Sequence, residues 1–158
     1  MTETDPSLPI RSPAIEPAGD SIEPAGDTAE PAADRYVPGV CNIGPWETRR
    51  RLVSGVFGMG VAAGLYAALV RAGAPRPVRA VVLLPAWGGA FSVLQARRHF
   101  CGAYAMRRIS NFGDTFDTIR SVEDEAAHRA DMAAVGRMTR DSLAIALVVA
   151  AAAVVLPT

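Results

Sequence analysis

The chain has 158 residues, enough for one ordinary domain, and half of these residues are hydrophobic. Sixteen basic residues, all of them arginine, balance sixteen acidic residues. Two cysteines exclude the disulfide framework of a small secreted protein, and the acidic, proline-rich N-terminus is not typical of a signal peptide.

The zero net charge conceals a strong segregation of charge. Residues 1–40 hold eight of the sixteen acidic residues, and they include three consecutive seven-residue units at 14–20, 21–27 and 28–34. Each unit contains a proline, which excludes a coiled coil. Low hydrophobicity and negative charge predict a disordered acidic tail over residues 1–40. Such a tail is either a solvated tether or a docking segment for a basic partner.

Two apolar stretches, residues 52–70 and 80–96, dominate the rest of the chain. Neither contains a charged residue, and a nine-residue loop, 71–79, separates them. A helix needs about 20 apolar residues to cross the hydrocarbon core, and backbone in lipid must satisfy its own hydrogen bonds. The two stretches therefore predict a transmembrane helical hairpin within residues 41–113; the alternative is a buried helical hairpin in a soluble protein.

Signals at the first stretch predict one helix over residues 45–70. Gly44 and Pro45 form a turn signal, and proline suits the first turn of a helix. Trp46 and an arginine run are expected at the lipid headgroups, together with a second arginine pair after residue 96. The expected headgroup contacts are Arg49, Arg50, Arg51, Arg97 and Arg98. In the second stretch, Pro85 predicts a kink.

Small residues recur every four positions in both stretches. The first holds two ridges, Gly60/Gly64/Ala68 and Ser54/Gly58/Ala62, and the second holds Gly88, Ser92 and Ala96. In lipid, small residues at this spacing let helix backbones approach closely. One ridge is expected to receive the second helix and the other a third helix or a partner. The alternative is that glycine is simply common in membrane helices.

The last part of the chain predicts two helices. Ser121 and Asp124 have the spacing of a capping box, which starts a charged cytoplasmic helix over residues 122–140 within the segment 114–141. Residues 143–156 are fully apolar and predict a third transmembrane helix within 142–158, although this run is short. The expected fold is thus an all-α membrane protein: a transmembrane helical hairpin, a third C-terminal transmembrane helix and a disordered acidic N-terminal tail.

Arginines are distributed unequally between the two ends of the hairpin. They are more numerous before residue 52 and after residue 96 than in the connecting loop. The positive-inside rule then places the N-terminus and residues 97–141 in the cytoplasm. Abundant Ala, Gly, Pro and Arg suggests a bacterial genome rich in G and C, so the expected location is the bacterial inner membrane, with several passes.

Residue types that perform chemistry are few. The three apolar stretches contain no charged residue or histidine, which argues against ion transport and haem ligation. Cys41 and Cys101 flank the hairpin and are expected on the same side of the membrane, where they would form a thiol switch or a shared metal site, or be merely structural. Arg97, Arg98 and His99 are the expected source of positive charge beside Cys101. We predict no catalytic residue, no cofactor and no metal site.

Residues 42–113 resemble a small bacterial membrane-domain family of unknown function, which occurs alone or fused to a rhodanese sulfurtransferase. The family pattern has Asn-(Ile/Val)-Gly, an acid with arginines, two glycine-rich spans and Cys-x-x-Tyr before a turn. Its matches in this chain are Asn42, Ile43, Gly44, Glu47, Arg49, Arg50, Cys101, Tyr104 and Asn111. Gly102 and Ala103 replace the usual proline after the cysteine, and a third span is added. No rhodanese domain is present, so the resemblance implies a membrane domain without implying sulfur transfer.

Two functions follow from these features. The first is a non-catalytic accessory, assembly or scaffold subunit of a larger membrane complex, with respiratory and photosynthetic complexes among the candidates. Its expected partners are the lipid bilayer and other membrane subunits or a second copy of the chain, and not nucleic acid. The alternative is a thiol-dependent redox or sulfur-relay protein centred on Cys101 and Cys41.

Overall fold

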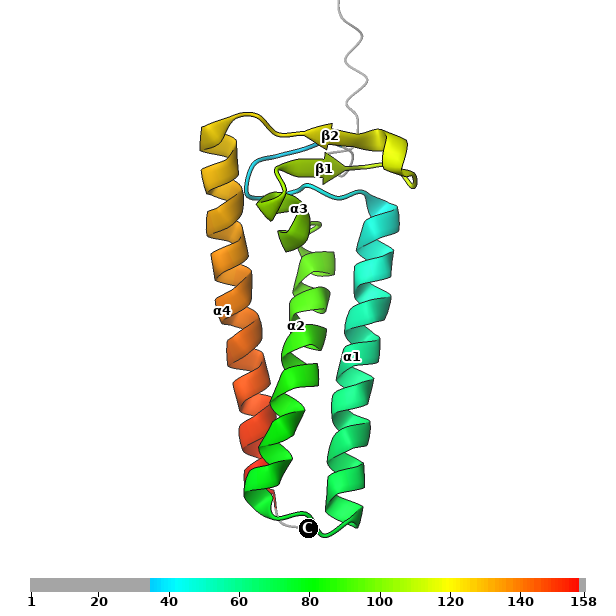
Figure 1. Cartoon of the computed structure of the whole chain (residues 1–158), viewed down its shortest axis with the longest axis vertical. Helices are drawn as coiled ribbons and strands as arrows, with labels where there is room; N and C mark the ends of the chain where they lie inside the picture. The colour runs from blue at the N-terminus through cyan, green and yellow to red at the C-terminus, as the bar shows by residue number, and fades with distance from the viewer. Residues whose placement is uncertain (1–34, 157–158) are drawn as a thin grey trace, which may run out of the picture.

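The computed structural model describes residues 35–156 and has three long helices side by side, with a small cap across one end (Figure 1). The cap comprises residues 36–44 and 99–124. The three seven-residue units, and most of the expected tail, lie outside the described residues. In chain order the elements are α1 (Pro45–Arg71), η2 (Arg76–Val82), α2 (Leu83–Arg97), α3 (Gly102–Met106), β1 (Ile109–Asn111), η3 (Phe116–Thr118), β2 (Ile119–Ser121) and α4 (Glu125–Val155).

Helix α1 confirms the prediction for residues 45–70. Pro45 occupies the first turn, where a backbone N–H has no partner within the helix, so the missing donor costs nothing. Thr48 Oγ1 donates to the carbonyl of Gly44 at 2.9 Å and fastens the first turn. With 27 residues the helix is about 40 Å long, more than the hydrocarbon core of a bilayer requires.

The second span begins differently from the expected kinked helix. Residues 76–82 form the 3₁₀ helix η2, and the α-helix α2 starts only at Leu83. Pro85 is therefore in the first turn of α2, a position where helices tolerate proline. The change of helix type falls just before the proline, and the two segments together form one apolar span, Arg76–Arg97.

The two helices expected after residue 121 are one. Helix α4 runs without a break from Glu125 to Val155, so the segments 114–141 and 142–158 are not separate helices. The expected cap at Ser121 is also wrong, because Ser121 pairs with Ile109 in the β1–β2 ladder. Asp124 caps the helix instead, its side chain accepting from the N–H of Ala126 at 2.9 Å.

Packing between α1 and α2 runs through three glycines that approach backbone to backbone. A Cβ on Gly58 would lie 2.9 Å from Cα of Gly89, one on Gly89 would lie 2.8 Å from N of Met59, and one on Gly55 would lie 2.7 Å from a backbone nitrogen. Of the two predicted ridges on α1, the one containing Gly58 therefore faces α2. A Cβ on Gly60 of the other ridge would meet nothing outside the backbone of its own helix within 4 Å.

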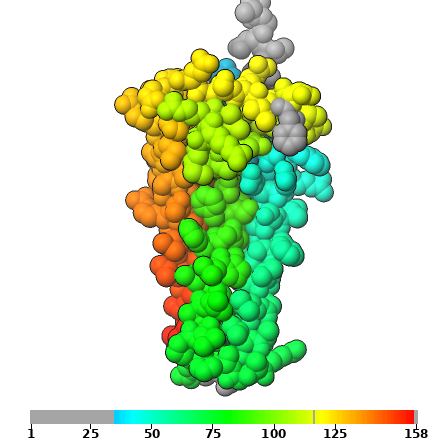
Figure 2. Space-filling view, viewed as in Figure 1, coloured from blue at the N-terminus to red at the C-terminus, as the bar shows by residue number. Residues whose placement is uncertain are grey.

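Helix α4 covers the other side of the pair. Ala146 packs with Ala62 of α1 and Ala86 of α2, all three of them buried. Trp87 faces α4 rather than the headgroups, because its Nε1–H donates to Oγ of Ser142 at 3.1 Å. Figure 2 shows the resulting column of three helices with the cap at one end.

Three helices of the described chain are long and apolar enough to cross a membrane: Pro45–Arg71, Arg76–Arg97 and Glu125–Val155. Large apolar side chains on their outer surfaces are exposed, including Phe57 at 73% and Val148 at 70%. Water would penalise such surfaces, whereas lipid tails solvate them. The fold class is therefore that of a multi-pass helical membrane protein, as predicted.

Candidate functional site

The cap brings together two parts of the chain that are far apart in sequence, residues 41–44 and 99–111. The N–H groups of Asn42 and Ile43 both donate to the carbonyl of His99, at 3.1 and 3.3 Å. Gly44 N–H donates to the Asn111 carbonyl at 2.9 Å, and Asn111 N–H returns a bond to Asn42 at 3.0 Å. These backbone bonds hold the start of α1 against the end of α2.

Cys101 lies at the centre of this junction and is 0% exposed. The Asn42 side chain binds its backbone on both sides: Nδ2 donates to the Cys101 carbonyl at 3.0 Å, and Oδ1 accepts from the Cys101 N–H at 2.6 Å. Gln95 Oε1 accepts from the next N–H, that of Gly102, at 3.1 Å. Two buried amide side chains therefore fix the backbone around the sulfur.

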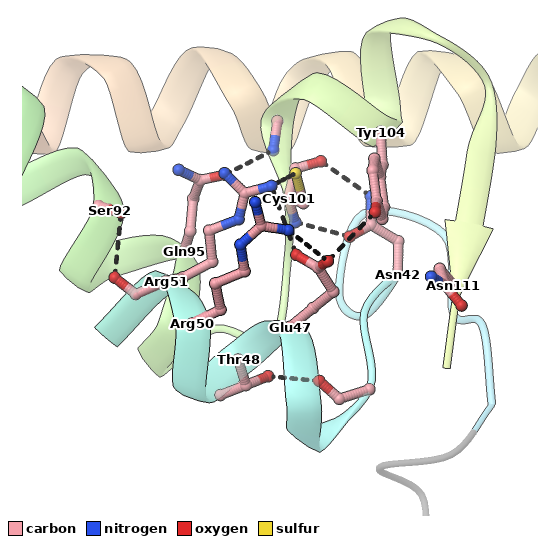
Figure 3. Close-up of polar contacts among 12 residues, drawn as sticks. Asn42, Glu47, Thr48, Arg50, Arg51, Ser92, Gln95, Cys101, Tyr104 and Asn111 are labelled. Carbon is pink, nitrogen blue, oxygen red and sulfur yellow. Dashed lines mark hydrogen bonds and ion pairs between the residues drawn. The ribbon is translucent and has the colours of Figure 1, made fainter. Parts of the chain in front are cut away.

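An arginine of α1 reaches the sulfur of this cysteine. Nη2 of Arg51 donates to Sγ of Cys101 at 3.1 Å and also lies 3.6 Å from Oε2 of Glu47 (Figure 3). Glu47 is only 5% exposed, and Nη1 of Arg50 pairs with its other oxygen at 3.5 Å. Glutamate, arginine and thiol thus form one buried polar cluster, which we call the Cys101 cluster.

Tyr104 of α3 completes the Cys101 cluster. Its hydroxyl donates to Oε1 of Glu47 at 3.4 Å. Burial of the ring, followed by the negative charge of Glu47, raises the pKa of Tyr104 above its ordinary value, so this hydroxyl keeps its proton and acts as a donor. Oε2 of Glu47 and Nε of Arg51 have no hydrogen-bond partner among the described residues, and a water or a small polar ligand would satisfy both.

Cys41, the second cysteine of the predicted pair, is buried in the same cap. Its Sγ approaches the carbonyl of Ile43 at 3.8 Å, whereas the sulfur of Cys101 accepts from Arg51. No disulfide joins the two residues. The cysteines share one end of the molecule, as hairpin geometry predicts.

The positive charge at Cys101 comes from a different residue than predicted. Arg97, Arg98 and His99 are all exposed, and Arg98 pairs with Asp141 at 2.8 Å. Arg51, expected at the headgroups, instead points into the Cys101 cluster with its side chain 28% exposed. The chain reverses after α2 with His99 in a left-handed conformation, φ 49°, and this reversal carries Cys101 back towards α1.

The predicted helix-packing residues divide into two groups. Ser92 is buried, and its hydroxyl donates to the carbonyl of Arg51 at 3.0 Å, which joins α2 to α1. Gly60, Gly64 and Gly88 would each place a Cβ in open space, and Ala68 is exposed. These four residues do not pack against another helix of the described chain, and their expected contact with a partner stays a prediction.

Arg49 and Arg50, the other predicted headgroup residues of α1, are exposed on the outer surface of this helix. Neither Gln95 nor the inward direction of Arg51 was predicted from the sequence. Two signals were available: Gln95 is a lone amide in an apolar stretch, and Glu47 stands four positions before Arg51, the spacing of an ion pair on one helix face. Neither signal alone identifies Cys101 as their neighbour.

Among residues 35–156 no group of three or more His, Cys, Asp or Glu side chains is arranged to hold a metal ion. Comparisons with family models, curated proteins and solved structures find no match to this chain. The resemblance of residues 42–113 to a membrane-domain family is therefore still a prediction. Five residues that carry it nevertheless lie together where the cap meets the start of α1: Asn42, Glu47, Cys101, Tyr104 and Asn111.

Proposed function

We propose that this chain is a non-catalytic integral membrane protein that serves as an accessory, assembly or scaffold subunit of a larger membrane complex. The observation that carries this proposal is the uncovered face of α1. In its most apolar window only 11% of the residues are buried, against 28% in each of the other two spans. Helix α1 is thus the span that the rest of the described chain covers least.

The uncovered face of α1 carries small residues at the spacing that lets a second helix pack closely. Gly60 and Gly64 have open space where a Cβ would stand, and Phe57 and Val61 are exposed on the same helix. Because lipid tails are as apolar as these side chains, burial does not drive association, and close backbone contact over small residues does. A helix of another subunit, or of a second copy, would gain that contact here.

The Cys101 cluster supports a structural role for the cap. Hydrogen bonds from Asn42 and Gln95 hold the backbone around the sulfur, and the sulfur has no exposed surface. A reactant would reach it only after the junction between α1 and α2 opens. Candidate complexes include respiratory and photosynthetic ones of the bacterial inner membrane, with the cap on the cytoplasmic side.

Co-purification tests this proposal. After gentle detergent extraction the full chain is expected to emerge with a fixed stoichiometry of other membrane subunits or of itself. Gly64→Leu, which places a large side chain on the uncovered face of α1, should abolish that association. Ala151→Leu makes a similar enlargement at an exposed position of α4 and should preserve it. A wild-type protein that is monomeric and alone after extraction would contradict the proposal.

A second candidate function, a thiol-dependent sulfur relay, follows from the contact between Arg51 and Cys101. The guanidinium of Arg51 donates to this sulfur at 3.1 Å, so it is placed to bind a negatively charged sulfur group. In such a relay the Cys101 thiol would take the outer sulfur of a donor persulfide, leaving the donor as a thiol and Cys101 as a persulfide. Incubation with a small persulfide donor and intact-mass measurement test this. A gain of one sulfur in the wild type but not in Cys101→Ser would favour the relay over the accessory role.

A further inference from the structure

A cavity of about 340 Å³ lies between the end of α2, the middle of α4 and the turn before α1. Three arginines and a histidine line it, together with buried apolar side chains that form its floor. The lining residues that matter here are Arg97, Arg98, His99, Arg137, Phe100 and Met138. This cavity is separate from the Cys101 cluster and shares no lining residue with it.

The charge in the cavity is not balanced by the residues that the structure describes. Asp141 forms an ion pair with Arg98 at 2.8 Å. Asp131 already accepts hydrogen bonds from the Tyr36 hydroxyl and the Gly39 N–H. The side chains of Arg97 and Arg137 make no ion pair or hydrogen bond with any described residue. Two guanidinium groups, each with several N–H donors, are therefore available to an anion in this cavity.

The walls of the cavity are fixed before any ligand arrives. Gly39 N–H donates to Oδ1 of Asp131 at 2.6 Å, and its backbone adopts φ 70°, a conformation that other residues rarely adopt. Phe100 and Met138 are 1% and 0% exposed and pack against each other in one core cluster. A basic rim over an apolar floor is therefore held in place by the fold.

The height of the cavity along the helices indicates what kind of anion reaches it. Arg97 directly follows the apolar run of α2, and Arg137 lies about 9 Å before Leu143, where the apolar part of α4 begins. In a membrane this is the depth of the lipid phosphates. Phosphate groups of anionic lipids bind such basic pockets between transmembrane helices.

We propose that this cavity is a binding site for the phosphodiester headgroup of an anionic phospholipid. Arg97 and Arg137 contact the phosphate oxygens, Arg98 is held beside them by Asp141, and the floor of Phe100 and Met138 meets the upper part of the lipid. This site is distinct from the general attraction of exposed arginines to a membrane surface, because it requires a particular pair of arginines. It does not depend on the proposed accessory role.

Native mass spectrometry of the full chain in mild detergent tests the site. Phosphatidylglycerol and phosphatidylcholine with identical acyl chains are titrated against wild type, and phosphatidylglycerol is expected to bind more tightly. The double variant Arg97→Gln/Arg137→Gln should bind it about 25-fold more weakly, since one arginine near a charged surface contributes about fivefold. The matched double variant Arg107→Gln/Arg129→Gln removes the same charge from exposed positions of the cap and of α4 that do not line the cavity, and it should bind normally.

Val40→Asp provides an independent variant that keeps all the arginines. Val40 lines the cavity and is 60% exposed, so a carboxylate there repels the headgroup without disturbing a buried contact. It should also weaken phosphatidylglycerol binding. Equal binding of the two lipids, or an equal loss in both arginine double variants, would overturn the proposal. Displacement of the lipid by millimolar inorganic phosphate would overturn it as well, since the site would then be one for soluble phosphate.

Discussion

Arg49 and Arg51 are two positions apart on α1 and yet have opposite surroundings. Arg49 is exposed, whereas Arg51 donates to Cys101 and lies 3.6 Å from the buried carboxylate of Glu47. A buried charge is costly unless it is paired, and Arg51 and Arg50 together pair the buried carboxylate of Glu47. The cap consequently depends on Arg51 and not on Arg49.

Arg51→Gln is expected to lower the free energy of unfolding by about 1–3 kcal/mol, because the buried carboxylate of Glu47 loses one partner while Arg50 and Tyr104 still contact it. Thermal unfolding in detergent measures the change. Arg49→Gln serves as the control and should alter stability little, because its side chain is exposed. Equal stability of the two variants would mean that Glu47 does not depend on Arg51.

Tyr36 ties the start of the cap to α4 and makes stability sensitive to alkaline pH. Burial of the ring, then the hydrogen bond to Asp131 and the charge of that carboxylate, raise the pKa of Tyr36 above 10.0, its ordinary value. Above pH 10 the unfolded chain loses this proton before the folded chain does. The stability that Tyr36 contributes to the folded state is therefore fully present below pH 10 and is lost as the pH rises beyond it.

Tyr36→Phe removes the titrating hydroxyl and should flatten this decline. The variant is expected to be less stable than wild type at pH 8, because Asp131 loses a hydrogen bond, and to lose less further stability between pH 10 and 11. Melting temperatures measured across this range check the expectation. Parallel curves for variant and wild type would show that Tyr36 is not the group responsible.

At the scale of elements, the contact between α1 and α2 depends on glycines facing each other. Cβ atoms at Gly58 and Gly89 would meet backbone atoms of the opposite helix at 2.9 and 2.8 Å, and backbone cannot give way as a flexible side chain can. Gly60, on another face of α1, has open space beside it. Two glycines in one helix therefore have different tolerances for a methyl group.

Gly58→Ala should destabilise the protein by about 1–3 kcal/mol through overpacking. The matched variant Gly60→Ala should leave stability unchanged or raise it by up to about 1 kcal/mol, since alanine is the better helix former. Unfolding in a denaturing detergent series compares the two. If Gly60→Ala proves the more harmful variant, then Gly60 and not Gly58 faces α2, which contradicts the packing described above.

The continuity of α4 is a second result at this scale. Its charged first half packs against α3 and the end of α2, with Ala134 and Met138 in the same buried cluster as Phe100. Its apolar second half lies against Ala62 and Ala86. Helix α4 therefore packs against both the cap and the transmembrane part of α1 and α2, and it fixes their relative position along the helix axis.

At the scale of the whole molecule, the cap and the α1–η2 loop lie at opposite ends of the column, and the C-terminal end of α4 lies beside the loop (Figure 1). With the cap in the cytoplasm, as the arginine distribution predicts, reporter fusions after Gly73 and after Thr158 should both report the outside. A fusion after Gly113, in the cap, should report the cytoplasm. Opposite locations for the first two reporters would remove α4 from the set of spans.

Composition alone determined the transmembrane segments and the start of α1. A charge-free run of apolar residues crosses a membrane because of its own transfer free energy, and Pro45 marks a helix start because of its own backbone. Such properties belong to a segment and do not depend on its neighbours. The helical hairpin, and the placement of both cysteines at one end, followed from them.

Tertiary structure decided which side chains meet. Four-residue spacing is the same for Gly58 and Gly60, and only the rotation of α1 against α2 selects Gly58 for the contact. Likewise Ser121 has the pattern of a helix cap, but pairing with β1 takes it into a strand and leaves the cap to Asp124. Arg51 turns inward because the chain reversal at His99 places a sulfur beside it. Each outcome depends on a long-range contact, whose free energy outweighs the small local preferences that a sequence pattern reports.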